Sequence, residues 1–324
     1  MNLSEHYTWE TQDATKIQCY MDCPRHYFFE YVLGWRPSAP NIHLEFGSAW
    51  HLAMEHLIIA GYDDASILEA YTLLNNYYRK FFSEMQDSIY HPKTPAMALK
   101  ALLEYVKEYQ HDRFTPLYTE IAGSVSLSEE HTITFKMDSI LSTPDGIKSR
   151  EHKTGSQLSR PWMDQWALKM QTGVYNHVLN CLFDPKDVWG VEINGTIFSK
   201  KDIKFQRVPA RRSLAAMEVW YWNTIDWLDE IQRDFSRLSS CSENDNTLRC
   251  FKQNTENCTK YFGCAYHDYC LAWPNPLQRC DEVPIGFTVS YWDPKGEEKD
   301  AKYIVSIEEG SANVKECRKE NGGE

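Results

Sequence analysis

The cysteines of this chain gather in two places. Cys23 lies near the start, and Cys258, Cys264 and Cys270 lie near the end, in the segment CTKYFGCAYHDYC. Four thiolates can hold either an iron–sulfur cluster or a structural zinc ion, and spacing alone does not separate the two. Because all four candidate ligands are thiolates, we expect a 4Fe–4S cluster that joins the two ends of the chain.

The other cysteines have different interpretations. Cys250 and Cys280 flank the C-terminal group and could replace one of its ligands. We expect Cys19, Cys181 and Cys241 to be buried or unreactive thiols.

A second set of chemically active side chains surrounds a predicted β-turn. The tetrapeptide Thr143-Pro144-Asp145-Gly146 has Pro in the second and Gly in the fourth position, as type I turns favour. A symmetric turn places Asp138 directly opposite Glu151, with their Cβ atoms ~5 Å apart. Lys153 shares their face because strand side chains alternate. Two carboxylates this close repel each other unless a cation lies between them.

The predicted cation is Mg²⁺ or Mn²⁺, because hard divalent ions prefer oxygen ligands. Such an ion activates water and stabilises a phosphate in transit, while Lys153 can orient the water or neutralise the oxyanion. If Gly146 forms a bulge, however, the pairing slips by one residue and His152 replaces Glu151 on this face. A solvated hairpin with a cross-strand charge cluster would contain the same residues.

Periodicity indicates the elements that position these residues. Helical spacing covers 15–35, 50–59 after a Gly47-Ser48 start, 162–183 and 213–238. An all-helical insertion is expected over about 62–115, interrupted at His91-Pro92 and Thr94-Pro95. Alternating apolar residues predict strands at 121–127, 131–141, 147–152, 188–198, 202–208 and 287–292.

Five short motifs follow one another along the chain. They are CPRHYFFEYVLGW from Cys23, FGSAWHLAMEH, KMDSI, REHKTG and QTGVY. In this order they resemble the RecB-type branch of the PD-(D/E)XK nucleases, especially its 4Fe–4S subgroup. That subgroup includes the nuclease domain of the AddB helicase subunit, the CRISPR adaptation exonucleases and many phage nucleases.

The resemblance implies an α/β fold: a PD-(D/E)XK nuclease core with a central mixed sheet flanked by helices, a helical insertion and an iron–sulfur clasp. It implies a nuclease domain over 1–280, with cluster-binding segments at 19–35 and 250–280, and a C-terminal tail with short strands over 281–324. The implied metal ligands are His51, Asp138 and Glu151, the catalytic lysine is Lys153, and the supporting pair is Gln171 and Tyr175. The implied cluster ligands are Cys23, Cys258, Cys264 and Cys270, although the C-x5-C-x5-C spacing here differs from the family's C-x2-C-x5-C.

The resemblance also implies a Mg²⁺- or Mn²⁺-dependent DNA nuclease. We expect an exonuclease that acts on DNA ends or single strands in recombination, repair or phage DNA metabolism, with a possible helicase or recombination partner. The alternative is a non-catalytic DNA-binding or assembly subunit that retains the fold, or a partner stabilised by zinc.

The net charge of -12 argues against a protein that coats nucleic acid over its whole surface. One stretch is basic, and we expect a phosphate-binding track at Lys200, Lys201, Lys204 and Arg207, or else a solvated strand edge. Trp162 and Trp166 could stack unpaired bases. The first residues contain no apolar run, and none in the chain reaches the roughly 18 residues of a membrane span. We therefore expect a cytoplasmic protein, in a bacterial or phage-infected cell.

Overall fold

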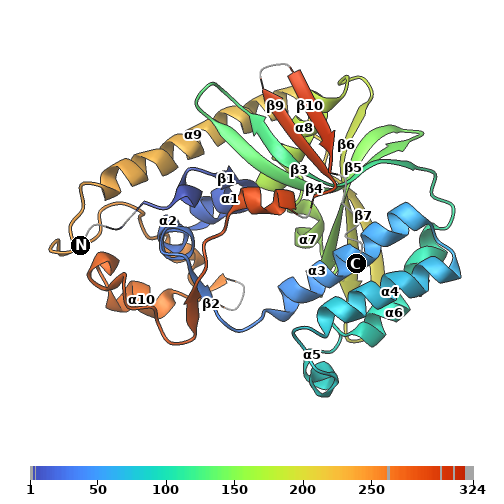
Figure 1. Cartoon of the computed structure of the whole chain (residues 1–324), viewed down its shortest axis with the longest axis horizontal. Helices are drawn as coiled ribbons and strands as arrows, with labels where there is room; N and C mark the ends of the chain where they lie inside the picture. The colour runs from blue at the N-terminus through green and yellow to red at the C-terminus, as the bar shows by residue number, and fades with distance from the viewer. Residues whose placement is uncertain (1–2, 4, 261–262, 300, 309–310, 318–324) are drawn as a thin grey trace, which may run out of the picture. The chain divides into compact units, whose positions relative to one another are not determined.

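The computed structural model describes residues 3, 5–260, 263–299, 301–308 and 311–317 (Figure 1). The chain divides into two compact units, each built from three segments. The first unit comprises Met1–Ala39, Ser124–Phe135 and Leu214–Lys299, and the second comprises Pro40–Gly123, Lys136–Ser213 and Asp300–Glu324. The boundary expected at residue 280 stays a prediction.

A large mixed β-sheet has the strand order β10-β9-β3-β4-β5-β6-β7, with β1 paired to β4 outside this order. Strands β3 and β4 run through both units. The strands β5 and β6 are parallel, whereas β4 pairs antiparallel with β5, β6 with β7 and β9 with β10. The bounds are β1 (Gln12–Asp13), β3 (Thr115–Ser126), β4 (Thr132–Thr143), β5 (Gly146–Gly155), β6 (Val188–Phe198), β7 (Ile203–Pro209), β9 (Tyr303–Glu308) and β10 (Ser311–Glu316). The predicted α/β class with a central mixed sheet is confirmed.

The β4–β5 hairpin has the predicted symmetric register. Thr143 pairs with Gly146 at the turn, and Ser139 pairs with Arg150 at the far end of the ladder. Extending this register by one residue places Asp138 opposite Glu151. The slip that would have brought His152 to that position does not occur, and the irregularity near Ile147 lies on the β6 side of β5 instead.

The crossover from β5 to β6 contains two helices rather than the single one expected over 162–183. They are α7 (Arg160–Asp164) and α8 (Met170–Leu182). Between the two helices, the Arg212 guanidinium donates hydrogen bonds to the carbonyls of Ala167 and Lys169, at 3.1 and 2.7 Å. The Lys169 carbonyl also accepts the Gly173 N–H at 3.2 Å, so Arg212 holds the start of α8 without taking this carbonyl from the helix.

Four helices of the second unit are α3 (Ile42–Ala60), α4 (Asp64–Tyr78), α5 (Asp87–Tyr90) and α6 (Pro95–Tyr109). The expected insertion is therefore helical up to its last residues, where β3 begins. Helix α3 starts at an Asn41 cap, so Gly47 and Ser48 lie inside this helix and do not begin it. Helices α3, α4 and α6 share a hydrophobic core with the end of β6. This core contains Phe46, Trp50, Leu57, Leu74, Tyr78, Leu102 and Phe198.

Trp162 packs onto two glycines of the sheet, which gives a test of the fold. A Cβ atom at Gly195 would lie 2.1 Å from Trp162 Cη2. We expect Gly195→Ala to lower the free energy of unfolding by about 1–3 kcal/mol, because the indole must move. Gly47→Ala is the control, since its Cβ would meet only Thr154 Oγ1 at 4.0 Å and a helical Ala stabilises by about 1 kcal/mol. Urea unfolding of both variants measures the difference, and equal stability would show that Trp162 is not held there.

The N-terminal helical region of the first unit is broken at Cys23. Helix α1 (Ala14–Asp22) ends there, α2 (Pro24–Tyr27) follows, and a π-helix, η2 (Phe28–Val32), continues it. Cys23 is extended, with φ -164° and ψ 109°, because a residue before proline is excluded from the helical region. The continuous helix expected over 15–35 is therefore wrong at this residue and after Val32.

The other elements of the first unit are contributed mainly by the C-terminal half of the chain. They are β2 (Trp35–Pro37), which pairs with β8 (Phe287–Val289), the long helix α9 (Leu214–Leu238), the short helix α10 (His267–Ala272) and 3-10 turns at Tyr7–Trp9, Thr255–Asn257, Pro276–Arg279 and Pro294–Lys299. A further 3-10 turn, Glu84–Gln86, precedes α5 in the second unit.

Buried contacts join both ends of the sequence within the first unit. The Tyr20 hydroxyl donates to Asp234 at 2.7 Å, and Arg25 donates to the carbonyls of Phe251 and Leu248 at 2.9 and 3.1 Å. Side-chain hydrogen bonds therefore join the N- and C-terminal segments within this unit, and the expected iron–sulfur clasp stays a prediction. No helix in the described part of the chain is long and apolar enough to cross a bilayer.

Candidate functional site

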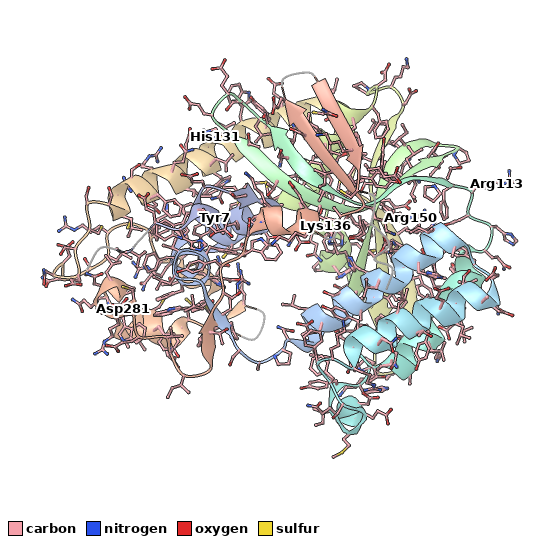
Figure 2. All side chains as sticks on the ribbon, in the orientation of Figure 1. Tyr7, Arg113, His131, Lys136, Arg150 and Asp281 are labelled. Carbon is pink, nitrogen blue, oxygen red and sulfur yellow. The ribbon has the colours of Figure 1, made fainter. Side chains whose placement is uncertain are left out.

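Two carboxylates meet where the β4–β5 ladder opens. The Asp138 N–H donates to Glu151 Oε1 at 3.1 Å, and the His152 N–H donates to Asp138 Oδ2 at 2.7 Å. Side-chain oxygens thus accept from main-chain N–H groups at this end of the hairpin. The remaining lone pairs of both carboxylates are available to a ligand. Figure 2 labels Lys136 and Arg150, which flank this point on β4 and β5.

A histidine and a lysine complete the group. His51, on α3, has its Nδ1 3.0 Å from Asp138 Oδ1. Lys153, two residues after Glu151 on the same face of β5, has its Nζ 3.6 Å from Glu151 Oε2. The structure therefore brings together four residues that the sequence motifs singled out, from α3, β4 and β5.

Burial makes this group electrostatically unusual. Glu151 is 1% exposed, and burial together with the charge of Asp138 raises the pKa of Glu151 to about 8. Burial acts on Asp138 too, but His51 and Lys153 outweigh it and hold the pKa of Asp138 below its usual value. The two carboxylates can both ionise when a cation neutralises them. Two carboxylates and one imidazole suit Mg²⁺ or Mn²⁺ in their ligand chemistry.

His152 belongs to the opposite face of β5. Its Nδ1 lies 3.0 Å from Asn194 Nδ2, and Asn194 also donates to Tyr105. Burial is the main reason that the pKa of His152 falls to about 3, so this imidazole stays neutral near pH 7. His152 therefore packs behind the site and does not replace Glu151.

Gln171 and Tyr175, one turn apart on α8, contact each other. The Gln171 amide donates to the Tyr175 hydroxyl at 2.8 Å, and that hydroxyl donates to the Lys136 carbonyl on β4. Tyr175 thus fixes α8 against the strand that carries Asp138. Gln171 points to Tyr175, whereas an interaction with Lys153 or the DNA backbone was expected.

Glu120, on β3, was missed by the sequence reasoning. Its carboxylate lies 3.1 Å from Lys136 Nζ, and burial followed by the charge of Asp138 raises the pKa of Glu120 to about 7. Its backbone has the strained φ of 46°, which is often found at functional positions. The sequence signal that could have identified Glu120 was its position next to an apolar strand. The strand was expected to begin one residue later, at Ile121, so Glu120 was left outside it.

The basic stretch divides into two parts. Lys200 and Lys201 are exposed in the β6–β7 turn, and Lys204 forms an ion pair with Asp202 at 3.3 Å. Arg207 does not fit the expected track, because its guanidinium bonds to Asp112 and lies 3.7 Å from the centre of the Tyr109 ring. The candidate phosphate-binding residues are thus the three lysines alone.

The four candidate cluster cysteines lie in the first unit. The Asn254 N–H approaches Cys23 Sγ at 3.4 Å, which joins the N-terminal cysteine to the C-terminal segment. Burial and the nearby thiolates of Cys23, Cys264 and Cys258 outweigh the charge of Arg25 and together raise the pKa of Cys270 to about 12. The four thiols are therefore close enough to influence one another's ionisation.

The spacing of these thiols bears on the kind of metal centre. Each zinc–sulfur bond is about 2.3 Å, so thiolates around one zinc lie roughly 4 Å apart. Within the described ranges, no three of these four sulfurs lie within 4.8 Å of one another. This spacing is wider than thiolates around one zinc ion take, and the expected 4Fe–4S cluster stays a prediction.

Burial raises the pKa of Cys19, and Cys23 and Cys264 lie close enough for their charges to raise it too, whereas other cysteines have other neighbours. Cys241 and Cys250 lie 3.8 Å apart at sulfur, and Cys280 contacts the Leu277 carbonyl. Cys181 is exposed on α8, so of the two alternatives expected for this thiol, buried or unreactive, only the second fits. Of the two tryptophans considered for base stacking, Trp166 is 8% exposed, which favours packing for that side chain.

Comparison with known proteins adds three findings. Residues 14–271 match the family model described as the PD-(D/E)XK nuclease superfamily. No curated protein matches the sequence. A solved structure titled "Crystal structure of SSO0001" is similar at 10% sequence identity and a TM-score of 0.30, over 69% of this chain and 78% of that one.

Proposed function

Because the chain belongs to the PD-(D/E)XK nuclease superfamily, whose members are metal-dependent nucleases, we propose that it is a DNA exonuclease acting on ends or single strands. The observation that supports this proposal most is the meeting of Asp138, Glu151, His51 and Lys153 on one side of the β4–β5 hairpin. Metal-assisted hydrolysis of a phosphodiester uses an ion held by carboxylates, with a cationic group nearby to stabilise the developing charge, and these residues offer both.

Each residue has a distinct role in this proposal. Asp138, Glu151 and His51 would hold Mg²⁺ or Mn²⁺, which when bound supplies an acidified water and charge stabilisation. Lys153, within 3.6 Å of Glu151, orients the attacking water and neutralises charge on the phosphate. Tyr175 keeps α8 fixed against β4, and Gln171 keeps the Tyr175 hydroxyl in place.

The four-cysteine group supports a second part of the proposal. Cys23, Cys258, Cys264 and Cys270 bind a 4Fe–4S cluster, because four thiolates with spacing wider than zinc requires suit a polynuclear centre. The cluster has a structural role here, since its ligands come from both ends of the sequence. Bound metal of this kind contributes directly to folding free energy.

The test compares linear with circular single-stranded DNA, each labelled throughout. The proposal predicts mononucleotides or short products from linear DNA only, no cleavage in EDTA, and recovery with Mg²⁺ or Mn²⁺. Cleavage of circles would instead indicate an endonuclease. DNA binding without cleavage in either metal would indicate a non-catalytic subunit.

The lysines of the β6–β7 turn predict how an acidic protein holds DNA. Changing Lys200, Lys201 and Lys204 together to Gln should weaken binding to all DNA sequences. The salt dependence should fall by roughly one unit of slope for each phosphate group that the variant no longer binds. The matched control changes three other exposed lysines to Gln, namely Lys100, Lys107 and Lys186. DNA affinity measured at several salt concentrations should separate the two triple variants, and identical slopes would place the DNA elsewhere.

A further inference from the structure

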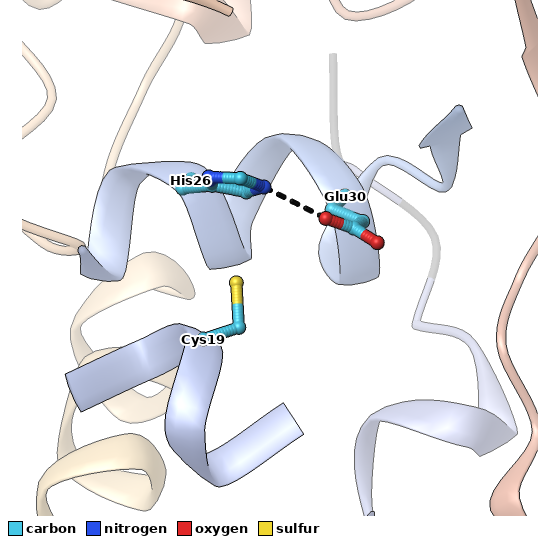
Figure 3. Close-up of side chains that lie close together, drawn as sticks. All are labelled: Cys19, His26 and Glu30. Carbon is cyan, nitrogen blue, oxygen red and sulfur yellow. Dashed lines mark hydrogen bonds and ion pairs between the residues drawn. The ribbon is translucent and has the colours of Figure 1, made fainter. Parts of the chain in front are cut away.

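A compact group of possible ligands lies beside Cys23, and neither the four-cysteine group nor the hairpin site uses it. Cys19, His26 and Glu30 have ligand atoms within 4.8 Å of one another. In Figure 3 the Cys19 thiol points from α1 toward the gap between the His26 ring and the Glu30 carboxylate. From this geometry we propose that Cys19, His26 and Glu30 bind a single Zn²⁺ ion, separate from the iron–sulfur cluster.

The ligand chemistry fits zinc. One thiolate, one imidazole and one carboxylate are the sulfur, nitrogen and oxygen donors that zinc accepts, at bond lengths of about 2.0–2.3 Å. Those bond lengths separate neighbouring ligand atoms by roughly 3–4 Å, which the present spacing reaches with a small side-chain movement. Three protein ligands leave a fourth position for water.

The atoms around the ligands are also arranged as a metal site requires. Glu30 Oε1 lies 3.0 Å from Arg36 Nη1, so Oε2 is the oxygen that faces His26 Nε2, at 2.7 Å. His26 Nδ1 lies 3.8 Å from Cys264 Sγ, and the imidazole packs edge-on against Tyr266. Ligating histidines usually donate their second ring N–H to such a partner, which fixes the ring's orientation. His26 is thereby oriented with Nε2 toward the site.

The backbone gives separate support. Glu30 lies in the π-helix Phe28–Val32, whose i→i+5 bond joins the Leu33 N–H to the Phe28 carbonyl at 2.9 Å. Single-turn π-helices occur often at functional sites. The three ligands come from both sides of the break at Cys23, with Cys19 on α1 and the other two after Pro24. A bound ion would therefore fix the shape of the chain around Cys23.

Proton balance is straightforward. In the metal-free protein His26 Nε2 and Glu30 Oε2 are joined by a hydrogen bond of 2.7 Å, whose proton lies between these two atoms. Zn²⁺ replaces that proton and the Cys19 thiol proton, and both are released to solvent.

The experiment measures zinc and iron per chain by elemental analysis, after the full-length protein is saturated with Zn²⁺ and dialysed free of unbound metal. The wild type should hold one more zinc than Cys19→Ser, with equal iron. Glu30→Gln should weaken Zn²⁺ affinity at least about tenfold, measured by competition with a fluorescent chelator. Cys181→Ser is the matched control. Cys181 also lies near a histidine, His177, at 3.8 Å and one helical turn away. Among the described residues, however, this pair has no third ligand group within 4.8 Å.

Three results would overturn the zinc site. The first is equal zinc in wild type and Cys19→Ser. The second is loss of iron rather than zinc from Cys19→Ser, which would make Cys19 a cluster ligand. The third result matters if Cys19→Ser fails to fold. In that case a folded Glu30→Gln protein with the same zinc affinity as the wild type would overturn the site. If the four-cysteine group binds zinc instead of iron, the wild type should still hold one more zinc than Cys19→Ser, so failure of the cluster and failure of this zinc site give different results.

Discussion

Asp138→Asn should abolish DNA cleavage, lowering the rate by about a thousandfold or more, in the range lost with a metal site or a general acid–base group. The amide keeps the shape of the side chain and can still accept the His152 N–H bond, so the fold should persist. What disappears is the negative charge that faces His51 and, in the proposal, the metal ion. Cleavage of labelled linear DNA in Mn²⁺ measures the effect.

The control for this prediction is Asp145→Asn, on the turn of the same hairpin. Asp145 is 72% exposed at its side chain, so the same chemical change there should leave the rate within a factor of about two. Circular dichroism should show both variants folded. If Asp138→Asn cleaves DNA at the wild-type rate, the assignment of the hairpin as the active site is wrong.

Cys23→Ser should remove the iron and lower the stability of the first unit together. Cys23 is the one candidate cluster ligand from the N-terminal region, and its loss leaves three thiolates from a short C-terminal segment. Since metal binding is folding free energy, we expect the free energy of unfolding to fall by more than about 4 kcal/mol. Iron content and thermal unfolding of anaerobically purified protein measure the two effects.

Cys181→Ser provides the comparison, because it removes an exposed thiol from the second unit. Its iron content and melting temperature should match the wild type. A Cys23→Ser protein with full iron would show that another thiol, such as Cys250 or Cys280, completes the cluster. A wild-type protein with stoichiometric zinc and no iron would contradict the cluster altogether.

The hairpin shows how far local sequence rules reach. The turn Thr143-Pro144-Asp145-Gly146 predicted the register that the structure has, because a symmetric four-residue turn fixes every pair in the ladder, but a bulge at Gly146 remained an alternative that only the structure excludes. The alternation of strand side chains then placed Lys153 beside Glu151. Whether a segment forms a helix or a strand was also predictable, because the spacing of apolar residues can be seen in the sequence alone.

What the sequence could not predict depends on contacts between distant segments. Arg207 reads as a free cation in the sequence, but Asp112, 95 residues away, forms an ion pair with it. Glu120 is an ordinary polar strand residue until β3 lies beside Lys136. The proximity of Cys19 to Glu30 likewise depends on the break at Cys23 and the π-helix that follows it. The spacing of apolar residues in the sequence does not predict these contacts.

The proposed chemistry depends on a divalent ion held by Asp138 and Glu151, and calorimetric titration of the chain with Mn²⁺ tests for this ion directly. We predict that wild type and Asp145→Asn bind Mn²⁺ with equal affinity, whereas Asp138→Asn and Glu151→Gln each bind it at least about tenfold more weakly. Equal Mn²⁺ affinity in all four proteins would contradict the proposed metal site.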